Sequence, residues 1–318
     1  MTANAATPLA TATPRRTLPS LTRSRRGQPS LIRQAALQAI TILVLLTVLF
    51  PILWVIAISL DPLNRSRPEG LSLIPANATL EAYGQVIAQP TNNPISFLSL
   101  AANSLKIALG TSVISVVIGV SAAYAFARLR FRGREVLMLA ILGVLMLPPV
   151  ATLTPLFVML NQVQVNLPLV GAFNLRSSLL GVGLAIISGL LPFAIWNLKG
   201  YLDTIPRDLE EAAWVDGAGA NQTFIRIILP LALPALAVTG FLGFVSGWTE
   251  FYFSWMFLNK VDDQTLAMAL YAMQGQFAST PWSQFSAFAI LFAIPPAIVY
   301  FFAQRYITSG LAVGGVKG

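Results

Sequence analysis

The chain of 318 residues is 56% hydrophobic and only 10% charged, whereas a soluble globular domain is roughly half apolar and about a quarter charged. It contains no cysteine and no histidine, which excludes disulfides, thiolate or imidazole metal sites, and catalytic Cys/His dyads or Ser/His/Asp triads. The net charge of +8 leaves nucleic acid to be considered as a partner until the positions of the basic residues are known.

The amino-terminal segment is basic and lacks a hydrophobic period. It is rich in Thr, Pro, Ala and Arg, a composition that buries too little apolar surface to fold, so we expect residues 1–36 to be a disordered cytoplasmic segment. It is not a cleavable signal peptide, because the apolar run that follows is long enough to span a membrane and remain there.

Six apolar stretches predict an all-α, polytopic membrane helix bundle over residues 37–309, followed by a short cytoplasmic tail, residues 310–318. Each stretch approaches or exceeds the roughly 20 residues that a helix needs to cross about 30 Å of hydrocarbon. Prolines within them are tolerated in membrane helices but predict kinks. The expected spans are Leu37–Leu60, Ala101–Ala127, Val136–Leu160, Ser178–Leu198, Leu229–Leu258 and Phe285–Phe302.

The basic residues predict the orientation of these spans. If the amino terminus is cytoplasmic, all but five of the 20 Lys and Arg residues fall in cytoplasmic segments, as the excess of Lys and Arg in short cytoplasmic loops requires. We therefore expect both termini in the cytoplasm. The concentration of Lys and Arg in cytoplasmic segments accounts for the net positive charge, so no nucleic-acid partner is expected. The five exceptions are Arg65, Arg67, Lys106, Arg176 and Lys260.

The cytoplasmic loop of residues 199–229 differs from the others. Pro206 suits a first helical turn, and Asp208, Glu210 and Glu211 follow where carboxylates complement the positive end of the helix dipole. A short cytoplasmic helix should start there. These acids also fit a plain solvated helix that has no partner, and the spacing alone does not decide between the two.

The end of this short helix is marked by small residues. Gly217 and Gly219 offer left-handed caps, and Asn221 can cap the start of the next helix. The small residues Ala212, Ala213, Gly217 and Ala218 would let another protein approach the loop closely. The loop is therefore a candidate docking surface.

The same loop resembles the EAA signature of ABC importer permeases. It has Glu211-Ala212-Ala213, three residues, Gly217, nine residues, and then Ile-x-Leu-Pro over residues 227–230. Other segments resemble the maltose-type, carbohydrate-uptake branch of these binding-protein-dependent permeases. They are Asn103-Ser104, the run from Ala122 to Arg128, Pro192-Phe193, Gln304-Arg305-Tyr306 and the ending Gly310 to Gly318.

The resemblance implies an inner-membrane subunit that is not itself an enzyme. Its partners would be a second homologous permease, two ATPase subunits that bind ATP and Mg, an extracytoplasmic solute-binding protein, a sugar and membrane lipid. The chain lacks a Gly-x-x-x-x-Gly-Lys-Ser/Thr phosphate cradle, and no cofactor is expected on it. The implied ATPase-coupling residues are Glu210, Glu211, Ala212, Ala213, Asp216, Gly217 and Ala218.

Glu250 lies inside the predicted fifth span, where a carboxylate is costly and usually faces a cavity or a partner. Aromatic neighbours could stack on a sugar ring while Glu250 and Thr249 hydrogen-bond its hydroxyls. The alternative is structural, with Glu250 paired to a neighbouring helix or to the partner permease and the aromatics at the membrane interface. The substrate-pathway candidates are Trp248, Thr249, Glu250, Tyr252 and Asn103.

Other classes of protein fit less well. An ion-coupled secondary transporter needs midplane ionisable groups and internal repeats, but Glu250 is nearly alone and no repeat is apparent. An intramembrane enzyme would need paired catalytic groups, which the spans lack. A related permease for a polyamine, an amino acid or a phosphate ester remains open. Gly240, Gly243 and Gly247 recur at three- and four-residue steps, which predicts close helix packing.

Overall fold

The structure is a computed structural model that describes residues 31–63, 75, 77–168, 171–274 and 280–314. Within these residues, four helices are long and apolar enough to cross a membrane, and two bent helix pairs raise the number to six if each pair is one span. This confirms the predicted all-α membrane helix bundle. The chain divides into two units, Met1–Pro51 and Ile52–Gly318.

The boundary between the units lies inside helix α1, Leu31–Ser59. The helix is apolar enough to cross a membrane, and at about 1.5 Å per residue its 29 residues exceed the hydrocarbon thickness. It begins six residues before the predicted span, so the prediction of disorder is wrong for residues 31–36, where good helix formers continue the apolar run. Residues 1–30 lie outside the described part of the chain.

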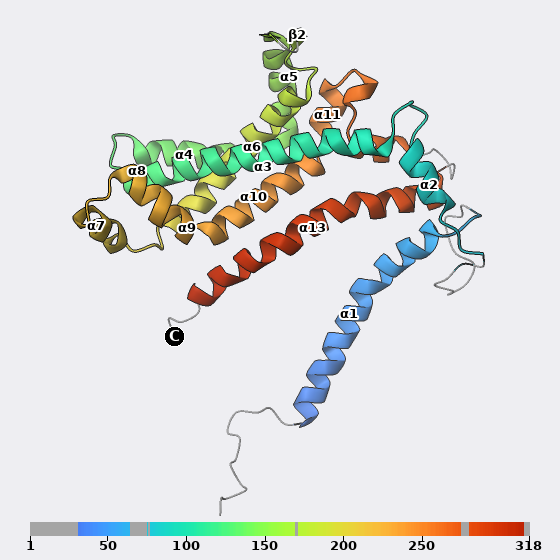
Figure 1. Cartoon of the computed structure of the whole chain (residues 1–318), viewed down its shortest axis with the longest axis horizontal. Coiled ribbons are helices and arrows are strands. Elements are labelled where there is room, and N and C mark those ends of the chain that lie inside the picture. The colour runs from blue at the N-terminus through green and yellow to red at the C-terminus, as the bar shows by residue number, and fades with distance from the viewer. Residues whose placement is uncertain (1–30, 64–74, 76, 169–170, 275–279, 315–318) are drawn as a thin grey trace, which may run out of the picture. The chain divides into compact units, whose positions relative to one another are not determined.

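Unit 2 contains the remaining elements (Figure 1). In chain order they are α2 (Glu81–Ala88), α3 (Phe97–Arg128), α4 (Arg134–Leu145), the 3-10 turn η1 (Pro149–Thr152), α5 (Leu153–Asn161), β1 (Gln164–Leu167), β2 (Gly171–Asn174), α6 (Leu179–Leu202), α7 (Asp208–Val215), α8 (Ala220–Thr223), the π-helical turn η2 (Phe224–Ile228), α9 (Leu229–Leu231), α10 (Leu233–Trp248), α11 (Tyr252–Phe257), the 3-10 turn η3 (Val261–Asp263), α12 (Leu266–Ala272) and α13 (Trp282–Gly314).

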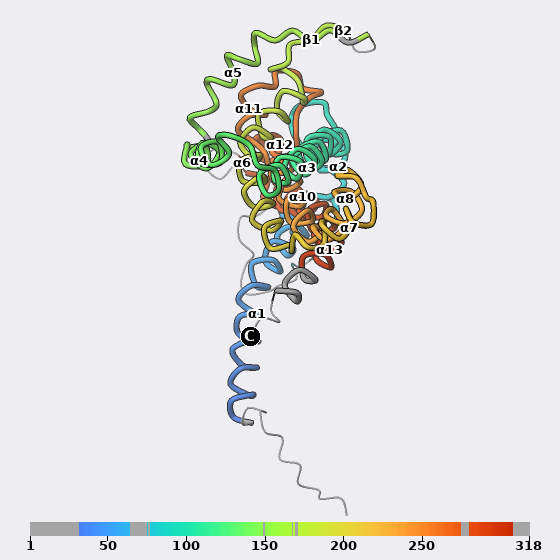
Figure 2. The backbone as a smooth tube through the Cα atoms, turned by 90° about the vertical axis from the view of Figure 1, so that its left-hand side faces the viewer, coloured from blue at the N-terminus to red at the C-terminus, as the bar shows by residue number. Residues whose placement is uncertain are grey.

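Helices α3, α6 and α10 form the centre of unit 2, where α3 packs against both of the others (Figures 1 and 2). The contact between α3 and α10 is close because glycines of α10 face it, as their spacing predicts. Thr111 donates its hydroxyl to the carbonyl of Gly243 at 2.9 Å, and Ser112 donates to the carbonyl of Gly240 at 2.7 Å. Backbone approach and interhelical hydrogen bonds together fix α10 on α3.

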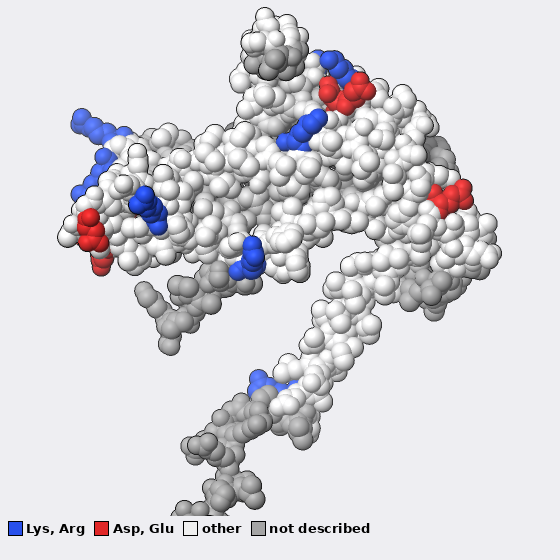
Figure 3. Space-filling view, viewed as in Figure 1, with Lys and Arg blue, Asp and Glu red and all other residues white. Residues whose placement is uncertain are grey.

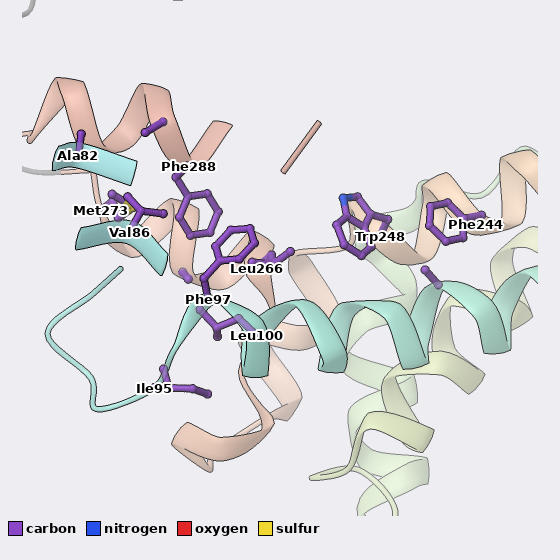
Figure 4. Close-up of a cluster of buried hydrophobic side chains, with 13 residues drawn as sticks. Ala82, Val86, Ile95, Phe97, Leu100, Phe244, Trp248, Leu266, Met273 and Phe288 are labelled. Carbon is purple, nitrogen blue, oxygen red and sulfur yellow. The ribbon is translucent and has the colours of Figure 1, made fainter. Parts of the chain in front are cut away.

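A buried apolar cluster packs the start of α3 against α2, α10, α12 and α13 (Figure 4). Phe97 of α3 meets Phe288 of α13 edge to face, with ring centroids 5.2 Å apart. Trp248 and Phe244 of α10 stack at 5.8 Å in the same cluster. Aromatic rings bury large apolar surfaces, so these contacts favour close packing of the four helices on α3.

The predicted third span, Val136–Leu160, is not one continuous helix. Helix α4 and the helical run that starts at Val150 are inclined by 100°, since Pro148 and Pro149 lack the N–H groups that would continue α4. An antiparallel hairpin, β1 with β2, follows α5 and pairs Gln164 with Asn174 at its open end. This hairpin was not predicted, because the sequence was assigned to helices and loops alone.

The predicted fifth span, Leu229–Leu258, is also interrupted. The chain bends by 76° between α9 and α10, just before Pro234, and α10 ends at Trp248, so Glu250 lies in a break before α11 rather than inside a helix. Helix α13 is longer than its predicted span, and residues 310–314 belong to it instead of to a separate tail. Residues 315–318 lie outside the described part.

Candidate functional site

The short helix predicted in the cytoplasmic loop is confirmed as α7, with Asp208, Glu210 and Glu211 in its first turn. Gly217 has a φ of +85°, which lets the N–H of Ala218 bond to the carbonyl of Ala213 at 2.9 Å and close the helix. The prediction of a left-handed Gly219 is wrong, since its φ is −73° and it caps the start of α8. The cap assigned to Asn221 is also wrong, because Asn221 lies within α8.

Of the seven predicted coupling residues, Glu210 and Ala213 face the interior of unit 2. Glu210 is only 3% exposed and Ala213 only 7%. The Glu210 carboxylate accepts hydrogen bonds from the guanidinium of Arg128 and, at 3.2 Å, from the hydroxyl of Tyr124, both on α3. These two residues therefore hold α7 against the chain rather than presenting a free surface.

The opposite side of α7 is exposed. We define the α7 knob as the seven exposed residues between Leu209 and Gly217 on this helix and its cap. Trp214 is 53% exposed and Val215 87% exposed. Neither was among the predicted coupling residues, although large apolar residues in a polar loop helix are a signal for a contact surface. Ala218 is half-buried. The α7 knob consists of Leu209, Glu211, Ala212, Trp214, Val215, Asp216 and Gly217.

Charged side chains accompany the α7 knob. Most of the face drawn in Figure 3 is uncharged, while acidic and basic side chains lie together at the end where Figure 1 places α7. Arg130 and Arg132 between α3 and α4 are exposed. The Glu211 carboxylate makes no hydrogen bond or ion pair within the described part of the chain, so it is available to a partner.

Gly217 and Gly219 allow a matched test of the α7 cap. A Cβ atom would find open space at both positions, but only Gly217 has a left-handed φ. The left-handed conformation costs a residue with a Cβ about 1–2 kcal/mol, so Gly217→Ala should speed amide hydrogen exchange across α7 roughly five- to thirtyfold. Gly219→Ala should leave the exchange unchanged. Equal exchange rates in the two variants would show that the cap does not stabilise α7.

Two of the five pathway candidates are buried among other side chains. Trp248 is 2% exposed, and its indole donates to the carbonyl of Phe292 at 3.0 Å. Asn103 is 5% exposed, and its amide donates to the carbonyls of Asp262 and Gln264. The structure gives both residues scaffold contacts and does not bring them to a surface with the other candidates.

The carboxylate of Glu250 organises the break between α10 and α11. One oxygen accepts the backbone N–H of Phe253 at 2.6 Å, and the other accepts the backbone N–H and the hydroxyl of Ser254 at 2.9 and 2.6 Å. These bonds satisfy N–H groups that have no partner inside α11. Glu250 thus has a structural role, because its carboxylate caps the amino-terminal end of α11.

Exposed aromatic side chains surround this break. Tyr252 is 66% exposed, Trp255 55% and Tyr271 49%, and all three rings lie within 6 Å of the Phe251 ring, between centroids. We call these four residues the aromatic patch. Tyr271 was missed in the sequence because it comes from α12 and joins the patch only through the fold. Thr249 is exposed next to it, with its hydroxyl donated to the carbonyl of Val245.

The described residues contain no group of three His, Cys, Asp or Glu side chains placed to hold a metal ion.

Residues 115–313 match a family described as the inner membrane component of binding-protein-dependent transport systems. The chain is 37% identical, over 85% of its length and 91% of the relative's, to the maltose/maltodextrin transport system permease protein MalG of Photorhabdus laumondii. It is 32% identical to the galactooligosaccharides transport system permease protein GanQ of Bacillus subtilis, again over 85% and 91% of the two chains. The trehalose/maltose transport system permease protein MalG of Thermococcus litoralis is 33% identical, over 87% and 94%.

Solved structures share the fold. A chain of a bacterial ABC transporter involved in the import of the acidic polysaccharide alginate superposes with a TM-score of 0.69 and 22% identity, over 91% of this chain and 99% of that one. A chain of the MetNI methionine ABC transporter in an inward-facing conformation gives a TM-score of 0.52 at 15% identity, over 67% and 94%.

Proposed function

We propose that this chain, which belongs to the family of inner-membrane components of binding-protein-dependent transport systems, forms half of the translocation pore of an ATP-driven sugar importer. The observation that carries the proposal is its identity of 32–37% to permeases named for maltodextrin, trehalose/maltose and galactooligosaccharide transport. The methionine transporter shares the fold at only 15% identity, so the fold does not choose the solute. Sequence relatives favour sugar over a polyamine, an amino acid or a phosphate ester.

The proposed assembly contains a second homologous permease, two ATPase subunits and an extracytoplasmic solute-binding protein. ATP and Mg bind on the ATPase subunits, and this chain is the transport component. We place it in a bacterial inner membrane, surrounded by lipid, with both termini in the cytoplasm. The exposed Arg130 and Arg132 at the end that carries α7 support this orientation, because cytoplasmic loops are rich in Lys and Arg.

The α7 knob is the proposed docking surface for the ATPase. Trp214 and Val215 offer apolar surface, Glu211 offers a charge, and Ala212 and Gly217 add little bulk. In the proposed cycle, ATP binding closes the ATPase pair and displaces α7, and the pore turns from inward-facing to outward-facing to receive the sugar. Hydrolysis then resets the pore.

The aromatic patch is the proposed contribution of this chain to the substrate pathway. Exposed rings can stack on the apolar faces of a sugar, and Tyr252 adds a hydroxyl that can hydrogen-bond. Thr249 borders the patch. Glu250 would act by capping α11 and so positioning Tyr252 and Trp255, rather than by binding the sugar itself.

Glu250→Ala should lower the stability of the assembled transporter. The substitution removes the acceptor for two backbone N–H groups and for the hydroxyl of the buried Ser254, and each buried donor left unsatisfied costs about 1–3 kcal/mol. Glu250→Gln keeps one oxygen acceptor and should lose less stability, with an unchanged KM for uptake. Thermal unfolding in detergent and uptake kinetics measure the two effects. A KM raised manyfold in Glu250→Gln at unchanged stability would instead indicate direct contact with the sugar.

Reconstitution tests the proposed function. The chain is co-expressed with its partner permease and ATPase subunits, purified, reconstituted in lipid vesicles, and assayed for ATP hydrolysis with the cognate binding protein and a panel of ligands. Maltose, maltodextrins, trehalose and galactooligosaccharides form the sugar set, and putrescine, methionine and glycerol phosphate form the other. Stimulation by a sugar supports the proposal. Stimulation only by a non-sugar, or uptake without ATP as in an ion-coupled transporter, overturns it.

A further inference from the structure

We propose that Arg128, Tyr124 and Glu210 form a buried latch that fastens α7 to the end of α3, so that a displacement of α7 is transmitted directly to α3. The displacement of α7 by an ATPase rests on the proposed function. The attachment of α7 to α3 rests only on the contacts in the structure. The latch assigns Glu210 a positioning role inside the chain, in place of the ATPase contact expected from its sequence.

The ion pair at the centre of the latch is buried. The side chains of Arg128 and Glu210 are 8% and 4% exposed, so each charge has given up most of its water and depends on the other. The Tyr124 hydroxyl donates to the second carboxylate oxygen at 3.2 Å. Its ring is fixed in turn against Phe224, with centroids 4.8 Å apart.

Two further hydrogen bonds cross between α3 and the segment before α7. Arg128 donates to the carbonyl of Ile205 at 2.9 Å, and Arg207 donates in the opposite direction to the carbonyl of Ala127 at 3.1 Å. The last turn of α3 and the approach to α7 are thereby joined by guanidinium groups from both sides. The five-residue connection between α6 and α7, residues 203–207, cannot shift without breaking these bonds.

Within the described residues, the latch provides the only side-chain hydrogen bonds between α7 and another element. Of the eight residues of the helix, only Glu210 and Ala213 are buried, while Leu209, Trp214 and Val215 are exposed. Because Glu210 is the charged residue through which this short exposed helix is attached, α7 should move together with the element that binds Glu210. That element is α3, which carries Arg128 and Tyr124.

Helix α3 can carry the displacement across the membrane. It runs for 32 residues from Phe97 to Arg128 without a proline, and at about 1.5 Å per residue it spans roughly 48 Å. Thr111 and Ser112, near its middle, are bonded to α10. A contiguous set of packed and hydrogen-bonded groups thus connects the α7 knob with α10, the helix that ends beside Glu250.

The coupling ratio tests the latch. In the reconstituted complex, Arg128→Gln and Glu210→Gln should each lower sugar transported per ATP hydrolysed at least fivefold, with ATP hydrolysis retained. The charge-exchanged pair Arg128→Glu with Glu210→Arg should recover part of the ratio. The control is Asp203→Asn, which breaks the exposed ion pair between Lys199, in the last turn of α6, and Asp203, the residue that follows α6. This variant should leave the coupling ratio unchanged.

A distance measurement separates failure of the latch from failure of the proposed function. Because the chain has no cysteine, spin labels can be placed with Asp208→Cys and Ile118→Cys, both at exposed positions. The distance distribution between α7 and α3 should be narrow in this background and broader when Arg128→Gln is added. An unchanged distribution, or an unchanged coupling ratio in a complex that couples normally, overturns the latch. A wild-type complex without sugar-dependent ATP hydrolysis overturns the proposed function while the distance result still judges the latch.

Discussion

Replacing Glu211 with lysine should abolish solute uptake while the chain remains inserted in the membrane. Glu211 is exposed on the α7 knob, with no partner of its own within the described residues. Its loss from the first turn of α7 costs the helix only about 0.3–1 kcal/mol of dipole interaction. Reversal of its charge at a docking surface costs several kcal/mol when like charges are brought together. Uptake and co-purification of the ATPase subunits measure the effect.

Glu135→Lys is the matched control for this result. Glu135 is an exposed acid in the first turn of α4, so its reversal changes the net charge and the helix dipole interaction in the same way without touching α7. Uptake should be near normal in this variant. Normal uptake in Glu211→Lys, or an equal loss in both variants, would remove Glu211 from the docking surface.

Gly247→Ala should separate α10 from α3 and destabilise the bundle. An added Cβ would lie 2.7 Å from the Cα of Ala108, a backbone atom that cannot turn aside as a flexible side chain can. Over-packing of this kind typically costs about 1–3 kcal/mol, and the shift would also weaken the hydrogen bonds from Thr111 and Ser112 to α10. Thermal unfolding of the purified complex in detergent measures the loss.

Gly240→Ala provides the comparison on the same helix. Its added Cβ would meet Val116 Cγ2 at 3.4 Å and Ser112 Oγ at 3.5 Å, both ordinary contacts with side-chain atoms. The unfolding temperature of Gly240→Ala should stay close to that of the wild type. If the two glycine variants unfold at the same temperature, close backbone approach at Gly247 does not hold α10 on α3.

The positions of the long helices were predictable because a membrane crossing demands a long apolar run, and such runs are visible in one sequence. The breaks were harder to place. Pro148 and Pro149 indicated a kink, but whether a proline bends or ends a membrane helix depends on what neighbouring groups satisfy the freed carbonyls. No proline stands between Pro234 and Leu258 to mark the break at Glu250, and the capping bonds of Glu250 to Phe253 and Ser254 form only once the chain has turned.

The coupling loop shows a second limit of the sequence. Glu210 and Glu211 are adjacent and chemically alike, yet one is buried and the other exposed. The difference depends on Arg128, which lies 82 residues away along the chain and which no local pattern connects to Glu210. Trp248 and Asn103 show the same limit, because residue type suggested contact with a solute while tertiary packing gave each an internal partner.

The π-helical turn Phe224–Ile228 belongs to a second connection, along the chain from α7 to α10, that we expect to be more flexible than the latch. Along the chain, α7 leads through this turn, Pro230 and the 76° bend before α10, a series of places where regular helical bonding is lost. The connection through Arg128 to the unbroken α3 is stiff by comparison. A displacement of α7 would therefore act on α3 directly, and on α10 chiefly through the hydrogen bonds that Thr111 and Ser112 of α3 make to it.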